Sequence, residues 1–473
     1  MNSTYQKPDT DTREADAEEK RPSQRPAFAS PIVRKLSICL CALCAVVFFV
    51  WGLLFFLRPA VSETEKRELT KFPAITWKSF RSGEWTEQIS LWYADTFPGR
   101  DGLTSAFHGL KSLYGIRDEL YEGGTGDNIP DGTMGDPDAH TQEEPETTAP
   151  VDPNAGSQGE TIGGYYVTGD TAYELYYFKE SNSYRYAAVI RKAGETLKGR
   201  AQVYDLVVPL SYSFALGADV QKELGAADGQ KVAAFLYSGM GDDVRTVDVY
   251  GALMAHRNEY LFFRTDHHWT ATGAYWAYDA FCRKAGITPT PLSAYEKLTF
   301  DGFLGTLYAK TEQPAAMTDH PDYVEAYVPA GTNSMVIVNT KGETESVYPI
   351  IQRKTDIYYT NPASKYNCFI AGDNPLTTIH NDRIAQDRRG TSVLLIKESF
   401  GNAFAPFLVD SYEYVYVLDY RYFKGEPDGA GGMKNADLAS FVSAHGIGTV
   451  IFLNNVDATT ADARLTELER LVK

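Results

Sequence analysis

The sequence predicts an α/β domain with a mostly parallel sheet flanked by helices, preceded by a single transmembrane helix. Short runs rich in β-branched and aromatic residues recur after Tyr165, and several end in polar or glycine-containing turns, which is typical of buried strands. A capped helix lies between the last two runs, and an uncharged apolar run lies near the N-terminus. The strand candidates are residues 201–210, 365–372, 391–397, 412–420 and 448–455.

The helix between the last two strand candidates, "NADLASFVSAHG" (435–446), carries its own end signals. Asp437 can cap its first turn, and Gly446 can end it. A strand, helix, strand order implies a right-handed crossover between parallel strands. Because chemistry in such sheets sits beyond the carboxyl ends of the strands, we expect functional side chains there.

The apolar run at residues 36–57, "LSICLCALCAVVFFVWGLLFFL", is uncharged and long enough to cross a bilayer of roughly 30 Å. Basic residues precede it, so the positive-inside rule predicts a disordered cytoplasmic tail at 1–35 and an extracytoplasmic remainder. A cleaved signal peptide fits less well, because the apolar run and the tail are both long and no small-x-small site follows. We therefore expect a single-pass protein of the cell membrane.

Three further regions follow the apolar run. Residues 58–122 have helical apolar spacing in part and predict a juxtamembrane helical region. Residues 123–164 contain no Lys or Arg and many acids, which predicts a flexible acidic linker. Residues 165–473 form the predicted α/β domain. The net charge of −17 argues against a nucleic-acid partner, which would need basic patches. A disulfide between Cys282 and Cys368 stays open, because the sequence alone cannot show it.

One candidate functional segment is "TDHHW" (265–269), which follows the predicted strand "EYLFFR" (259–264). Asp266 and His268 are two residues apart, so in an extended segment they point the same way, and His267 points to the other side. This spacing favours His268 as the base, with His267 as the alternative. An aspartate in this place can orient the histidine and stabilise its imidazolium. Trp269 is expected to pack, or to cover the site as a lid. A helix is expected to begin near Thr270 or Thr272.

A second segment, "LLIKESFGNAFAPFL" (394–408), reads as a strand, a turn with Ser399, and a helix. The hydroxyl of Ser399 would be exposed there, and the following helix N-terminus offers N–H groups to an oxyanion. Asn402 could support this site. The pattern differs from the GxSxG turn of α/β-hydrolases.

A third segment, "FIAGDNP" (369–375), offers the Gly372 N–H and the Asn374 amide as oxyanion donors. A nucleophile, a base with its acid, and oxyanion donors together predict an acyl-transfer site.

These segments resemble the DHHW protein family, which is related to the SGNH-hydrolase-like domains of the alginate O-acetylation proteins. The resemblance rests mainly on "TDHHWTATGAYWAY" and the serine turn, and it extends over roughly residues 60–121 and 165–456. It implies an SGNH-like fold with Ser399 as nucleophile, His268 as general base and Asp266 as its orienting acid. Gly372 and Asn374 resemble the oxyanion donors. The family's turn usually reads KDS, whereas this chain has Glu398 before the serine.

The resemblance implies an O-acetyltransferase or acetylesterase that acts on a cell-envelope polysaccharide without a cofactor. A polytopic membrane O-acyltransferase is the expected source of acetyl groups. Two alternatives remain open: a non-catalytic polysaccharide-binding or scaffold protein, and a metal-dependent phosphoesterase. The phosphoesterase hypothesis requires further Asp and His ligands, and the sequence of the α/β domain offers no convincing set. No metal ligand is therefore assigned. Arg421 and Tyr422 in "LDYRYF" either bind the polymer or take part in a structural ion pair.

Overall fold

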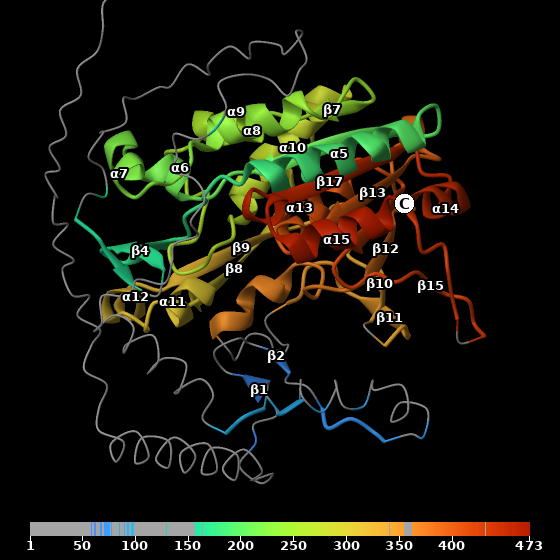
Figure 1. Ribbon diagram of the computed structural model, residues 1–473. Coiled ribbons are helices and arrows are strands. Elements are labelled where there is room, and N and C mark those ends of the chain that lie inside the picture. The colour runs from blue at the N-terminus through green and yellow to red at the C-terminus, as the bar shows by residue number, and fades with distance from the viewer. Residues whose placement is uncertain are drawn as a thin grey trace, which may run out of the picture. The chain divides into compact units, whose positions relative to one another are not determined.

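The computed structural model describes residues 164–473 apart from 340, 354–361 and 431, residues 156 and 158–162, and scattered positions from 58 to 129. The described residues fall into two compact units, one within 1–61 and 68–100 and the other within 62–67 and 101–473. The second unit contains the predicted α/β domain, and Figure 1 labels many of its helices and strands.

An eight-stranded sheet forms the centre of this unit, in the order β11-β10-β12-β14-β13-β17-β6-β7. The pairs among β14, β13, β17, β6 and β7 are parallel, whereas β10, β11 and β12 pair antiparallel. The strand bounds are β6 Gln202–Val208, β7 Val244–Thr246, β10 Met335–Val338, β11 Thr344–Tyr348, β12 Leu376–His380, β13 Ser392–Lys397, β14 Tyr414–Asp419 and β17 Thr449–Asn455.

The sheet is therefore mixed, and the prediction of a mostly parallel sheet holds only for its β14-to-β7 half. The antiparallel half begins with a hairpin, because β10 and β11 are joined by a short turn in which Gly342 N donates to Asn339 O. A connection this short cannot make the crossover that parallel strands require.

Two crossover connections between parallel strands determine where on the sheet a ligand site is expected. The chain runs from β13 through α13 (Gly401–Leu408) to its neighbour β14, then through α14 (Leu438–His445) back past β13 to β17. Because the two steps run in opposite directions, right-handed crossovers put α13 and α14 on opposite faces of the sheet. The direction of winding changes between β13 and β17, and ligands of open α/β sheets bind at such a point.

Helices cover the sheet in two groups (Figure 1). In one group α5 packs against α8, α14 and α15, and in the other α10 packs against α9 and α13. Their bounds are α5 Glu180–Leu197, α8 Gly229–Ser238, α9 Val249–Ala255, α10 Ala271–Ala285 and α15 Asp462–Leu471. The predicted caps are confirmed: Asp437 accepts from Ser440 N at the start of α14, and Gly446 ends it in the left-handed conformation.

Smaller elements surround the sheet and frame the site. The antiparallel pair β8 (Glu296–Phe303) and β9 (Asp322–Val328) precedes β10, and α11 (Thr306–Lys310) lies between the two strands. A three-stranded sheet contains β3 (Glu160–Ile162), β4 (Tyr165–Thr168) and β5 (Thr171–Tyr173). The remaining short elements used below are η4 (Pro362–Cys368) and η6 (Asp457–Thr459).

Two predicted strands are wrong. Residues 259–264 form a loop with a single bridge, between Phe262 and Trp269. Residues 365–372 form the end of η4 and a turn in which Ile370, Ala371 and Gly372 all have positive φ. Three successive left-handed residues cannot belong to a β ladder, so the apolar composition of this segment reflects burial and not strand pairing.

Most residues of the predicted tail, apolar segment, juxtamembrane region and linker lie outside the described residues, and their boundaries stay predictions. Among the described residues, no helix has the length and apolar character needed to cross a membrane. The folded unit begins earlier than residue 165, because β3 pairs with β4 and Ile129 is buried in the core. Cys282 and Cys368 are both buried and unpaired, so the disulfide considered above is not formed.

Candidate active site

The loop that carries Asp266 and His268 is held by one buried carboxylate. Asp322, the first residue of β9, accepts from Thr265 N at 2.8 Å, Thr265 Oγ1 at 2.7 Å and Arg264 N at 3.0 Å. It also accepts from the Tyr260 hydroxyl at 2.5 Å. Since these bonds use the N–H groups that a β ladder would need, the loop is fixed in a non-strand conformation.

The Asp266 carboxylate is fully engaged on both oxygens. Its Oδ1 accepts from His268 Nδ1 at 2.6 Å and from His268 N at 3.0 Å, and its Oδ2 accepts from Thr306 N at 2.8 Å and Thr306 Oγ1 at 3.0 Å. Gly305 packs directly against this carboxylate, and a Cβ atom there would collide with it. Burial alone would raise the pKa of Asp266, but His268, His267 and the hydrogen bonds from His268 and Thr306 lower it well below its usual range.

His268 joins this carboxylate to the serine. Its Nε2 lies 2.7 Å from Ser399 Oγ. Because an ionised carboxylate only accepts hydrogen bonds, Nδ1 carries the proton facing Asp266, and in the neutral ring Nε2 is the acceptor that faces the hydroxyl. The ring stacks on Tyr366, with 4.0 Å between centroids and 12° between planes, and the Tyr366 hydroxyl donates to Ser399 O at 3.1 Å. Tyr366 therefore holds both the His268 imidazole and the serine turn.

Ser399 lies on the turn between β13 and α13, half-buried at the carboxyl end of a fully buried strand. Gly401 allows this turn, since a Cβ there would collide with the Lys397 side chain. Trp269 donates from Nε1 to Phe400 O at 2.9 Å and is completely buried. It therefore packs between the loop and the turn, and the lid considered for it is excluded.

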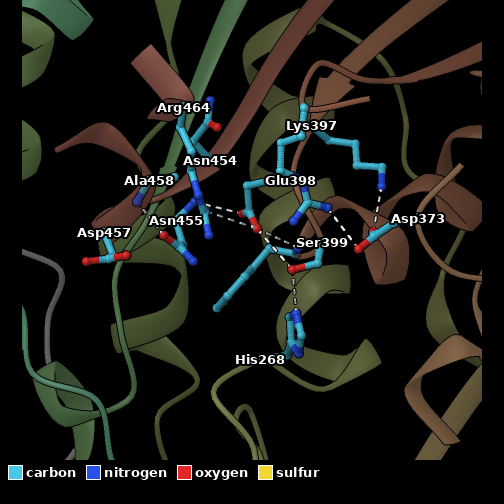
Figure 2. A network of polar contacts seen from close by, with 12 residues as sticks. His268, Asp373, Lys397, Glu398, Ser399, Asn454, Asn455, Asp457, Ala458 and Arg464 are labelled. Atoms are coloured by element: carbon cyan, nitrogen blue, oxygen red, sulfur yellow. Dashed lines mark hydrogen bonds and ion pairs between the residues drawn. The ribbon is translucent and has the colours of Figure 1, made fainter. Parts of the chain in front are cut away.

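Glu398, the residue before the serine, is completely buried, and its carboxylate lies against the Ser399 hydroxyl. Its Oε2 lies 3.1 Å from Ser399 Oγ and accepts from Phe400 N at 3.2 Å, and its Oε1 accepts from Asn455 N at 3.0 Å. Figure 2 shows this carboxylate between Ser399 and Asn455, with Arg464 nearby. The Phe400 N–H is thus already bonded and is not a free oxyanion donor.

A second polar cluster lies at the ends of β13 and β14. The buried Lys397 ammonium contacts Asp373 Oδ1 at 3.0 Å and Asp419 Oδ2 at 2.8 Å, because the parallel register sets Lys397 beside Asp419. Arg421 binds Asp419 through two nitrogens and also contacts Asp373 at 2.9 Å. Asn402 donates its amide to Asp373 at 2.9 Å. Arg421 therefore belongs to a structural ion cluster beside the site. Of the two roles predicted for it, this is the structural ion pair.

The predicted oxyanion donors are engaged within their own turn. Gly372 N donates to Phe369 O at 3.0 Å, and the Asn374 amide donates to Ile370 O at 3.1 Å. Their role at an oxyanion stays a prediction. The Ser399 N–H donates to no residue among those described, which makes it a further donor candidate. Tyr422 is 43% exposed, with its ring beside the Arg421 guanidinium.

His267 lies on the other side of the loop. Its Nδ1 is 2.6 Å from Thr306 Oγ1, and because that hydroxyl donates to Asp266, Nδ1–H is the donor to it. Burial and the neighbouring His268 hold the pKa of His267 well below its usual range. Asp266, His267 and His268 together could offer three metal ligands. Asp266 and His268, however, already use their facing atoms on each other and on Ser399, so the geometry favours the serine arrangement.

Sequence reasoning missed the groups that hold the site. Tyr366, Thr306 and Asp322 lie in segments without a motif, and only their hydrogen bonds to the loop and the turn identify them. Asp373 and Lys397 lie within two of the predicted segments, but the motif gave neither of them a role. Charged side chains at buried strand ends, such as the lysine that closes the apolar run of β13, were the available signal.

Fold and site together define an α/β protein with a buried Asp–His pair hydrogen-bonded to a serine at the carboxyl end of a central parallel strand. The family model described as DHHW protein matches residues 65–143 and 136–418. This match shows that the chain belongs to the DHHW family, and the predicted family resemblance is confirmed. The comparison with curated proteins gave no match.

Three solved structures illustrate the similarity. A DHHW family protein from Eubacterium siraeum is 26% identical, with a TM-score of 0.57 over 67% of this chain and 98% of that one. PatB1 from Bacillus cereus, in a structure with a sulfonyl adduct, is 16% identical, with a TM-score of 0.50 over 63% and 98% of the two chains. The O-acetyltransferase domain of Pseudomonas putida AlgJ also matches, at 15% identity and a TM-score of 0.31 over 61% and 90%.

Proposed function

We propose that the chain is an SGNH-like serine enzyme of acyl transfer, an O-acetyltransferase or acetylesterase that acts on a cell-envelope polysaccharide. One observation carries the proposal: Asp266 Oδ1, His268 and Ser399 Oγ form a continuous hydrogen-bonded chain with distances of 2.6 and 2.7 Å. Such a chain activates a serine for nucleophilic attack, because the base can remove its proton and the acid stabilises the resulting imidazolium.

The reaction has two halves. Ser399 Oγ attacks the acetyl carbonyl while His268 Nε2 takes the hydroxyl proton, and the same proton then passes to the leaving alcohol. The acetyl-serine is resolved by water in an esterase or by a sugar hydroxyl in a transferase, with His268 again taking the proton of the attacking group. The Ser399 N–H is a donor to the developing oxyanion, and Gly372 and Asn374 would join it if their turn releases them.

The cellular setting rests on the sequence and the family resemblance. Residues 36–57 would anchor the chain in the membrane with its main domain outside the cytoplasm. An enzyme there lacks acetyl-CoA, so a transferase needs acetyl groups from a membrane donor, for which a polytopic O-acyltransferase is the proposed partner.

The direct test is p-nitrophenyl acetate hydrolysis by the purified full chain in detergent. Ser399→Ala and His268→Ala should each lower kcat/KM by at least about 10³-fold. Ser443→Ala is the matched control, because Ser443 lies exposed on α14 and, among the described residues, its hydroxyl donates to Ala439 O alone. An unchanged rate in Ser399→Ala, with folding preserved, would sink the proposal in favour of a scaffold role. Loss of the rate with a chelator would point to metal chemistry instead.

A further inference from the structure

The Ser399 hydroxyl has one proton and two acceptors. Its oxygen lies 2.7 Å from His268 Nε2 and 3.1 Å from Glu398 Oε2, on different elements of the fold. Figure 2 shows the hydroxyl between the imidazole and the carboxylate. Glu398 itself is completely buried, with Asn455 N on its other oxygen.

The protonation of His268 decides which acceptor receives the hydroxyl proton. In the neutral ring Nε2 carries a lone pair, so the hydroxyl donates to it and the serine is ready to attack. In the imidazolium Nε2 becomes a donor to Ser399 Oγ, and the hydroxyl then turns to Glu398. In that second arrangement the imidazolium donates from Nδ1 to Asp266 and from Nε2 to Ser399, and the Ser399 hydroxyl donates in turn to Glu398.

We propose that Glu398 is a positioning residue that accepts a hydrogen bond from the Ser399 hydroxyl when His268 is protonated. Glu398 thereby sets the pH at which the rate falls on the acidic side of the pH–rate profile, its acid limb. The inference rests on the function proposed above. The Glu398 carboxylate stabilises the protonated, inactive arrangement for two reasons. Its negative charge is separated from the imidazolium only by the Ser399 hydroxyl, and it accepts the hydrogen bond that this hydroxyl no longer donates to His268.

The surroundings of Glu398 are consistent with a charged carboxylate. Donors face both oxygens, and Arg464 Nη1 from α15 lies 3.9 Å from Oε2. That nitrogen is buried and makes no hydrogen bond to any of the described residues. Arg421 after β14, Tyr420 at the same strand end and Tyr366 from η4 act on Glu398. Across the serine, the charged or titratable groups around His268 are Asp266, His267, Glu174 before α5 and Lys310 in α11.

Glu398→Gln keeps the shape and removes the charge. We expect the acid limb of the pH–rate profile to move to lower pH by about one pH unit. Glu398→Asp restores a charge on a shorter side chain and should return the limb toward the wild-type position. Asp457→Asn is the matched control, since Asp457 is a neighbouring acid in η6 that makes no contact with Ser399. Its limb should coincide with the wild-type limb.

The measurement is the rate at which phenylmethanesulfonyl fluoride labels Ser399 of the full chain between pH 4 and 9, followed by intact mass, with circular dichroism on each variant. This stoichiometric readout depends on the nucleophile and not on a polysaccharide substrate. If Glu398→Gln does not fold, Arg464→Gln serves as the test variant. The acid limb of Arg464→Gln should lie at higher pH than that of the wild type, because the Glu398 carboxylate loses the neighbouring guanidinium.

The outcomes separate the two proposals. A limb of Glu398→Gln that coincides with wild type, or an equal shift in Asp457→Asn, overturns the role of Glu398 and leaves the serine mechanism standing. When Glu398→Gln does not fold, a limb of Arg464→Gln that coincides with wild type overturns it equally. A wild-type chain that is never labelled at Ser399 overturns the proposed function and this inference together.

Discussion

His268 Nε2 lies 2.7 Å from Ser399 Oγ, although 131 positions separate the two residues in the chain. The contact depends on two supports outside the pair. Asp322 fixes the loop before His268, and Tyr366 stacks on the imidazole while bonding to the serine turn. An imidazole held from both sides keeps one orientation without a substrate, which the proposed proton transfer requires.

Asp266→Asn tests the orienting carboxylate. The amide keeps the shape but can present its NH₂ group to His268, which favours the wrong tautomer and leaves Nε2 protonated toward Ser399. We expect kcat/KM for p-nitrophenyl acetate to fall by about 10³ to 10⁴-fold with folding intact. A fall of less than about tenfold would contradict the orienting role.

Gly305→Ala tests the packing beneath the same carboxylate. Its Cβ would collide with Asp266, so the carboxylate must shift away from His268. A displacement of about 1 Å in such a site lowers the rate by about 10²-fold. Gly448→Ala is the control, because Gly448 is exposed and a Cβ there meets nothing within 4 Å. The two kcat/KM values, measured side by side, should differ by that factor, and equal values would contradict it.

Lys397→Met tests the buried ion cluster. The substitution leaves Asp373 and Asp419 with Arg421 as their remaining cation, and an uncompensated buried charge destabilises a protein by about 3–5 kcal/mol. Adding Asp419→Asn should recover part of this loss, since it removes one of the carboxylates left behind. Urea unfolding of both variants measures the effect, and a double variant no more stable than the single one would contradict the pairing. Lys198→Met, which removes an exposed ion pair with Asp243, should barely move the transition.

Asp205 links stability to pH. Burial raises the pKa of Asp205 from 3.8 to about 8, although the Tyr186 hydroxyl donates to it at 2.7 Å. Between these two values the folded state holds a proton that the unfolded state has lost. The contribution of this group to stability therefore falls as pH rises, by about 1.4 kcal/mol per pH unit, and levels off above pH 8.

Asp205→Asn should remove this pH dependence. The free energy of unfolding of the variant, relative to that of the wild type, should therefore rise between pH 5 and pH 8. The free energy of unfolding in urea at both pH values measures it. Asp301→Asn, at an exposed position, is the control and should run parallel to wild type. Parallel curves for Asp205→Asn would show that Asp205 is ionised in the folded protein.

The sequence by itself determined the local parts of the site. Short runs rich in β-branched and aromatic residues identified β13, β14 and β17, and the caps of α14 followed from Asp437 and Gly446. The turn that carries Ser399 was also predictable, because an apolar strand ending in polar residues before Gly401 has few other conformations. The spacing of Asp266 and His268 likewise placed both side chains on one side of the chain.

Only the tertiary structure decided what these parts contact. The loop at 259–264 looked like a strand by composition, but Asp322, 57 positions after Thr265, takes the N–H groups that a ladder would need. Glu398 reaches Asn455 across the same number of positions, because β13 and β17 are neighbours in the sheet. Local propensity acts over a few residues, whereas strand order and buried hydrogen bonds join segments far apart. For that reason the sequence identified the residues proposed to react, while the groups that hold them appear only in the folded chain.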